Sequence, residues 1–176
     1  MKTLNYRCRL YFIGLSVIYI IAFIIGVFYG REDYQIFKTI EFDILVPELQ
    51  MEDSFEIFIS ILKNNLTVAL LFFLSALFSL GILPIPLMFY NGFIFGNVWG
   101  CSTKFLCIKD ILSASLPHSL EFMGLIIFGV AGFQISYEHL INKQKPSYTF
   151  ISRLLISGIL IITVNALLES YISIRY

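Results

Sequence analysis

Charged residues are scarce in this chain of 176 residues: 14% are Asp, Glu, Lys or Arg, whereas 58% are hydrophobic. A soluble domain is nearer to a quarter charged and half apolar. The twelve basic and twelve acidic residues balance, so no net field attracts nucleic acid. The mean hydropathy is +0.84. A soluble core of this length could not bury so much apolar surface, and we predict an integral membrane protein.

Sequence patterns that carry known chemistry are also missing. The three cysteines show neither metal nor redox spacing. The chain has no nucleophile elbow, no phosphate-binding glycine loop and no His-Glu-x-x-His helix. We therefore expect a protein without an enzymatic reaction of its own, and an ATP-driven activity would need another subunit.

Long apolar stretches predict an all-α fold, a polytopic transmembrane helix bundle of about five spans within a single membrane domain covering residues 1–176. Basic residues lie before the first stretch and between the last two, and basic loops favour the cytoplasm. We therefore expect a protein of the cell membrane, with a cytoplasmic N-terminus and an external C-terminus. The stretches are residues 10–29, 66–83, 87–100, 111–136 and 154–173, and the basic residues are Lys2, Arg7, Arg9, Lys143, Lys145 and Arg153.

Two connections between these stretches have features of their own. Residues 30–63 hold eight acidic residues against three basic ones, which suits an external loop. Its last part, residues 55–63, is amphipathic and predicts a helix lying at the membrane interface. Pro84 and Pro86 end the second stretch, and the short stretch after them fits either a tilted span or a re-entrant or broken helix. Trp99 is interpreted as an interfacial anchor.

Ionisable and amide side chains inside the apolar stretches are the candidate functional residues. His118 and Glu121 lie in the fourth stretch, and Asn165 and Glu169 are four apart in the fifth. Such residues are costly in a bilayer unless they are paired or face a cavity, so we expect them to meet in one interior cavity near Asn91. A structural hydrogen-bond network, a proton relay and a divalent metal site held by His118, Glu121 and Glu169 all remain open, although catalytic zinc needs three protein ligands.

A set of polar residues, glycines and a proline in this order resembles the stage II sporulation protein M family over residues 64–173. In contrast to the family pattern, Ser119 follows the histidine where a glycine is usual. The residues that carry the resemblance are Asn64 and Asn65, Gly81, Asn91 with Gly92, Gly96, Pro117 with His118 and Glu121, and Glu169.

The resemblance implies a multi-pass protein that acts as a membrane platform with peptidoglycan hydrolases in sporulation. It equally implies a subunit beside an ATP-binding transporter component, or a role in peptide-bacteriocin export or immunity. The expected partners are therefore the lipid bilayer and one of these proteins, and a homo-oligomer remains open. The alternatives are an intramembrane metal-dependent hydrolase that uses the His118, Glu121 and Glu169 set, and a small proton-coupled permease.

Overall fold

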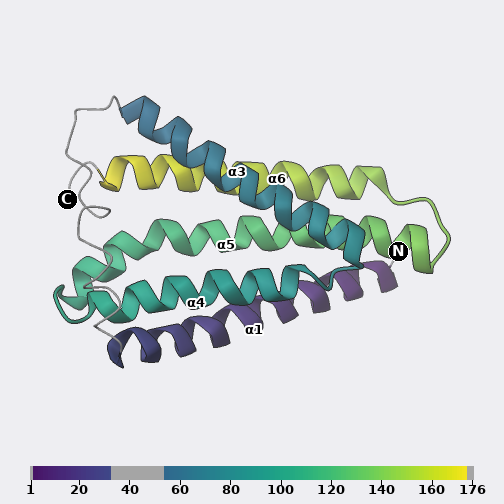
Figure 1. Ribbon diagram of the computed structural model, residues 1–176. Coiled ribbons are helices and arrows are strands. Elements are labelled where there is room, and N and C mark those ends of the chain that lie inside the picture. The colour runs from purple at the N-terminus through teal and green to yellow at the C-terminus, as the bar shows by residue number, and fades with distance from the viewer. Residues whose placement is uncertain (1, 33–53, 174–176) are drawn as a thin grey trace.

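Five long helices make up most of the described part of the chain (Figure 1). The computed structural model describes residues 2–32 and 54–173, except for the side chains of residues 2–5, 54, 114, 116–118 and 172–173. Most of the predicted acidic loop therefore lies outside the described residues. The all-α prediction is confirmed. The helices are α1 (Lys2–Glu32), α3 (Ser54–Ser79), α4 (Pro84–Ser102), α5 (Ile108–Ser136) with its short π-helical extension η2 (Tyr137–Ile141), and α6 (Tyr148–Ser173).

Four helices in the described part of the chain are long and apolar enough to cross a membrane. They are α1, α3, α6 and the part of α5 that continues into η2. α4 is not among them, although it runs beside α1 in the bundle (Figure 1). The fifth expected crossing therefore stays a prediction.

The separate interfacial helix predicted at residues 55–63 is not observed, because these residues are the first turns of one continuous α3. Neither proline nor glycine occurs anywhere between Ser54 and Ser79, so nothing in the sequence breaks the helix. The adjacent Asn64 and Asn65, where we expected a span to begin, lie within the same helix. The amphipathic pattern predicted the helix correctly but placed its boundary wrongly.

The α3–α4 connection is a tight turn built on Gly81. The residues Leu80 and Gly81 have φ angles of 54° and 83°, and the amide of Gly81 donates to the carbonyl of Ala76 at 3.0 Å, which is a common way to end a helix. Pro84 then stands at the start of α4, where its missing N–H leaves no gap in the helix. α4 is one continuous helix, so the broken-helix alternative is not observed. The choice between a tilted span and a re-entrant helix stays a prediction.

α5 is the central helix of the bundle. In its apolar window 56% of the residues are buried, against 17–28% in the other three candidate spans. It packs on α3, α6 and α1, and α1 runs antiparallel to it (Figure 1). Along that seam Tyr11 stacks on Phe133 with ring centroids 4.4 Å apart. Side chains on α5 are therefore placed between the other helices.

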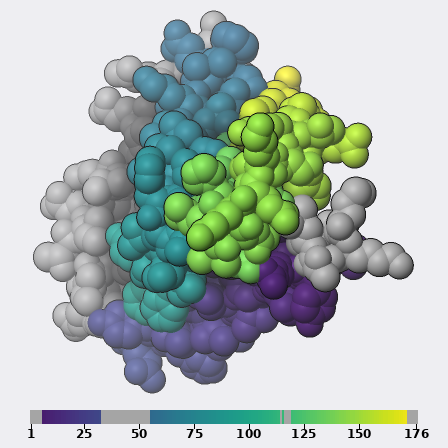
Figure 2. All heavy atoms as spheres, turned by 90° about the vertical axis from the view of Figure 1, so that its right-hand side faces the viewer, coloured from purple at the N-terminus to yellow at the C-terminus, as the bar shows by residue number. Residues whose placement is uncertain are grey.

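Both predicted basic clusters lie at the same end of the bundle. Figure 2 looks onto this end, where the green connection between α5 and α6 lies beside the purple start of α1. The guanidinium of Arg7 stands 4.6 Å from the centroid of the Tyr137 ring, and Lys143 and Lys145 are exposed in the connection. The helix ends at Glu32, Ser54 and Ser102 lie at the opposite end (Figure 1).

Candidate functional site

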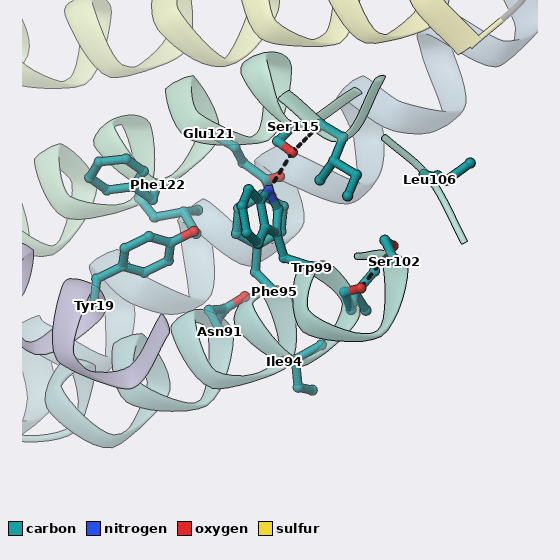
Figure 3. A pocket seen from close by; sticks show the side chains of 13 residues that line it. Tyr19, Asn91, Ile94, Phe95, Trp99, Ser102, Leu106, Ser115, Glu121 and Phe122 are labelled. Atoms are coloured by element: carbon teal, nitrogen blue, oxygen red, sulfur yellow. Dashed lines mark hydrogen bonds between the residues drawn. The ribbon is translucent and has the colours of Figure 1, made fainter. Parts of the chain in front are cut away.

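A cavity of about 380 Å³ lies between α1, α4 and α5, towards the end that holds the α4–α5 connection (Figure 3). In its wall, Tyr19 of α1 and Phe122 of α5 stack on each other with ring centroids 4.5 Å apart. The Nε1 group of Trp99 donates a 3.0 Å hydrogen bond to Oγ of Ser115. The indole of Trp99, which is partly buried, thus bridges α4 and α5, and its place at the membrane interface stays a prediction.

Two of the predicted site residues, Asn91 and Glu121, line this cavity from opposite helices. Glu121 is partly buried on α5. The amide nitrogen of Asn91 donates to the carbonyl of Leu87 in its own helix at 2.9 Å, and its side-chain oxygen points towards the cavity (Figure 3). The cavity thus has a carboxyl group and an amide oxygen within a wall that is otherwise mostly apolar and aromatic, apart from the hydroxyl groups of Tyr19, Ser102 and Ser115.

The predicted residues of α6 face α5 at nearly the same level as Glu121. A Cβ at Gly158 would stand 2.8 Å from the Phe128 ring, and one at Gly124 would stand 2.6 Å from Ile162. These two contacts show that α5 and α6 are antiparallel. The step from Gly124 to Phe128 goes forward along α5, whereas the step between their partners, from Ile162 to Gly158, goes backward along α6. Asn165 follows Ile162 on the same face by one turn.

The same register places Asn165 level with Glu121, which precedes Gly124 by one turn. Glu169 comes one turn further along the α5-facing side of α6. The described wall of the cavity includes neither Asn165 nor Glu169. Glu121 therefore stands between two environments, the cavity on one side and the α5–α6 interface on the other.

Buried amides without partners mark the interface of α3, α5 and α6. Asn165 is fully buried, and neither its Nδ2 nor its Oδ1 has a hydrogen-bond partner among the described residues. Asn65 of α3 is 3% exposed. Its Oδ1 accepts a 3.4 Å hydrogen bond from Asn64, whereas its Nδ2 has no described partner. An unsatisfied buried amide costs about 1–3 kcal/mol.

The metal hypothesis is not tested by this arrangement. Within the described residues no three His, Cys, Asp or Glu side chains form a group that could hold a metal ion. Pro117 and His118 lie in α5, but their side chains are outside the described residues. The metal set of His118, Glu121 and Glu169, and the meeting of all predicted residues in one cavity, stay predictions.

The glycines that carried the resemblance hold helices together. Gly92 and Gly96 lie on the face of α4 that contacts α1: a Cβ at Gly92 would stand 2.6 Å from the carbonyl oxygen of Tyr19, and one at Gly96 would overlap that of Phe23. Their partners are four apart in the same direction, so α1 and α4 run parallel. Gly81 is required both by its φ of 83° and by the side chains around it, since a Cβ there would stand 2.8 Å from the Phe133 ring.

Several residues of the α1–α4 interface and of the cavity were not predicted from the sequence. Gly26 and Gly30 of α1 face the backbone of Asn97 and its neighbours, and Gly100 faces Val27. The four-residue spacing of Gly26 and Gly30, matched by Gly92, Gly96 and Gly100, could have predicted the pairing. No signal in the sequence indicated that Tyr19, Trp99 and Ser115 would line one cavity.

These features define a polytopic membrane protein. The outward faces of the apolar helices carry large hydrophobic side chains such as Ile20, Leu71 and Leu160, which are 50–60% exposed, and contiguous apolar surface of this kind belongs in a bilayer. A bundle of several apolar helices with polar residues on their inner faces is the architecture of such a protein.

The chain belongs to the stage II sporulation protein M family, whose model matches residues 13–174. The match extends further than the predicted resemblance over residues 64–173, because it includes most of α1. In the structure, α1 pairs with α4 through glycines of both helices. No curated protein and no solved structure matched the chain.

Proposed function

We propose that this protein is a membrane platform without a reaction of its own, which holds a partner protein of the cell envelope at the membrane. The partner is a peptidoglycan hydrolase on the outer side or an ATP-binding transporter subunit on the inner side. The fixed packing of the helices carries this proposal. The family match supports it, since the family is named for a stage of sporulation.

The helices approach one another so closely that they have little room to slide. Backbone meets backbone at Gly26, Gly96 and Gly100 between α1 and α4, and a Cβ at Gly132 of α5 would overlap the carbonyl oxygen of Phe73 in α3. Glycine contacts of this kind bring helix backbones together and depend on a tight fit. A bundle with fixed helices suits a protein that presents docking positions.

The second candidate is a small proton-coupled permease, which the cavity favours. Glu121 borders the cavity and shares a level with Asn165, so a carboxyl group could exchange protons between the two environments. Transporters of this kind work by rocking one group of helices against another. An intramembrane hydrolase would additionally need a bound metal or a nucleophile with its base.

The proposed orientation in the membrane rests on the basic end of the bundle. Because basic loops favour the cytoplasm, we propose that the end with Arg7, Lys143 and Lys145 faces the inside of the cell. The α4–α5 connection, at the opposite end, is then outside.

The natural cysteines allow this orientation to be measured. Cys8 and Cys101 are buried, whereas Cys107 is exposed in the α4–α5 connection. A membrane-impermeant maleimide added to intact cells should therefore label the unaltered protein at Cys107. In a Cys107→Ser background, Lys143→Cys should react only after the membrane is opened. Labelling of Lys143→Cys in intact cells, with Cys107 protected in the unaltered chain, would reverse the orientation.

Photo-crosslinking in cells tests the platform proposal and identifies the side on which the partner sits. A photoreactive residue at Lys109 is expected to capture a peptidoglycan hydrolase, or one at Lys145 an ATP-binding transporter subunit, because both positions are exposed at opposite ends. The control position is Ile13, which is 55% exposed on an apolar span and should react with lipid. Capture of neither class of protein at either position would contradict the proposal.

A further inference from the structure

We infer that the cavity between α1, α4 and α5 binds the head group of an amphiphile that carries a protonated primary amine. The inference does not depend on the platform role, because it concerns what the cavity can hold rather than what the bundle supports. Its basis is the combination of oxygen acceptors, aromatic rings and an apolar rim around one half-open cavity.

The polar groups of the cavity match a cation that donates hydrogen bonds. Glu121 is the sole carboxylate among the described lining residues, and none of these lining residues is basic. The side-chain oxygen of Asn91 points towards the same space from the opposite helix (Figure 3). A primary ammonium has three N–H donors and no acceptor, and its hydrogen bonds to a carboxylate are the stronger, charge-assisted kind.

The aromatic residues of the cavity favour the same ligand. Tyr19, Trp99 and Phe122 border the space from three helices. Aromatic faces attract ammonium groups, and the attraction grows when both are removed from water. The hydrogen bond from Trp99 to Ser115 and the stacking of Tyr19 on Phe122 fix these rings in place. An anionic head group would meet the negative faces of the rings and the carboxyl group instead.

The size and the rim of the cavity indicate an amphiphile rather than a small soluble amine. At roughly 30 Å³ for each water-sized group, the volume of about 380 Å³ holds on the order of a dozen non-hydrogen atoms. Ile94, Val98 and Leu106 are lining residues that are also exposed on the outer surface of the bundle. A head group inside would therefore leave its apolar chain along these residues, where the bilayer lies.

Trp99 provides the measurement, because it is the single tryptophan of the chain and lines the cavity. Bromine on a bound chain quenches indole fluorescence on contact. The probes are three single-chain amphiphiles with identical brominated chains and different head groups: a primary ammonium, a neutral alcohol and a sulfate. They are added to the full-length protein in phosphatidylcholine nanodiscs. The ammonium probe is expected to quench saturably, with an apparent affinity at least tenfold above that of the other two.

The variants assign the selectivity to the cavity. Glu121→Gln should lower the affinity for the ammonium probe to that for the alcohol, and Asn91→Leu should lower it partly. Glu56→Gln is the matched control, since Glu56 is an exposed carboxylate of α3 outside the cavity. Equal quenching by all three probes, or unchanged selectivity in both Glu121→Gln and Asn91→Leu, would overturn the inference.

A second arm separates two sources of the amine. Brominated phosphatidylethanolamine, included in the phosphatidylcholine nanodiscs, offers the same primary amine on a membrane lipid. If brominated phosphatidylethanolamine quenches the Trp99 fluorescence more strongly than equally brominated phosphatidylcholine does, the ligand is a lipid head group. Selective quenching by the single-chain amine alone would assign the site to an amphiphile other than a phospholipid. Both results support the inference, whereas equal quenching by the three single-chain probes rejects it whatever the second arm shows.

Discussion

Gly96→Leu is expected to destabilise the protein by about 3 kcal/mol, because adding side-chain atoms to a closely packed interface forces the backbones apart. A Cβ at this position would overlap the carbonyl oxygen of Phe23 on α1. Backbone cannot move aside as the end of a flexible side chain can. The whole α1–α4 pair therefore has to separate, and Gly96→Ala should already show part of the loss.

Thermal unfolding of the purified protein in nanodiscs, followed by circular dichroism, measures this effect. Gly14→Leu is the matched control, since a Cβ at Gly14 has no atom within 4 Å and the residue is exposed on an apolar helix. Its stability should stay within about 0.5 kcal/mol of the unaltered protein. Equal stability of Gly96→Leu and Gly14→Leu would show that α1 and α4 do not pair as described.

Asn165→Leu is expected to raise the stability by about 1–3 kcal/mol, the cost of an unsatisfied buried amide. Asn165 is 0% exposed, and neither atom of its amide has a hydrogen-bond partner among the described residues. Leucine has a similar size and branching, so it can occupy the same space without polar atoms. The gain would identify Asn165 as a residue retained at the expense of stability, as residues with a function often are.

The control for this substitution is Asn91→Leu, whose amide already donates to the carbonyl of Leu87 and lies beside the cavity. It should bring no comparable gain in the free energy of unfolding. A loss of stability in Asn165→Leu would mean that the amide is hydrogen-bonded in the membrane, for example through a buried water.

The helices were predictable from the sequence because their signal is local. Long apolar stretches must satisfy their backbone hydrogen bonds internally, and Pro84 and Gly81 mark the one tight turn between α3 and α4. The predicted boundary between an interfacial helix ending at residue 63 and a span beginning at residue 66 was wrong, because it was also drawn from a local pattern. Asn64 and Asn65 are polar but do not break a helix, so α3 continues through them.

The pairing of the helices and the contacts between their side chains were less predictable. Both depend on how segments far apart in the sequence align with one another. The spacing of Gly92 and Gly96 favours a close approach of two helices but does not indicate that the partner is α1. Likewise, a lone tryptophan near the end of an apolar stretch favours an interfacial position. The bond from Trp99 to Ser115 depends on how α4 packs beside α5, which no local pattern encodes.

Glu169→Gln distinguishes a platform from a proton-relaying or metal-dependent protein. Glutamine keeps the shape of the side chain and can hydrogen-bond, but it does not ionise and is a poor metal ligand. If Glu169 only helps to hold α6 on α5, the variant should unfold at the same temperature as the unaltered protein. It should also restore the normal phenotype in a host strain that lacks this protein. A variant that folds with unchanged stability and fails to restore that phenotype would contradict the platform and favour the permease or the hydrolase.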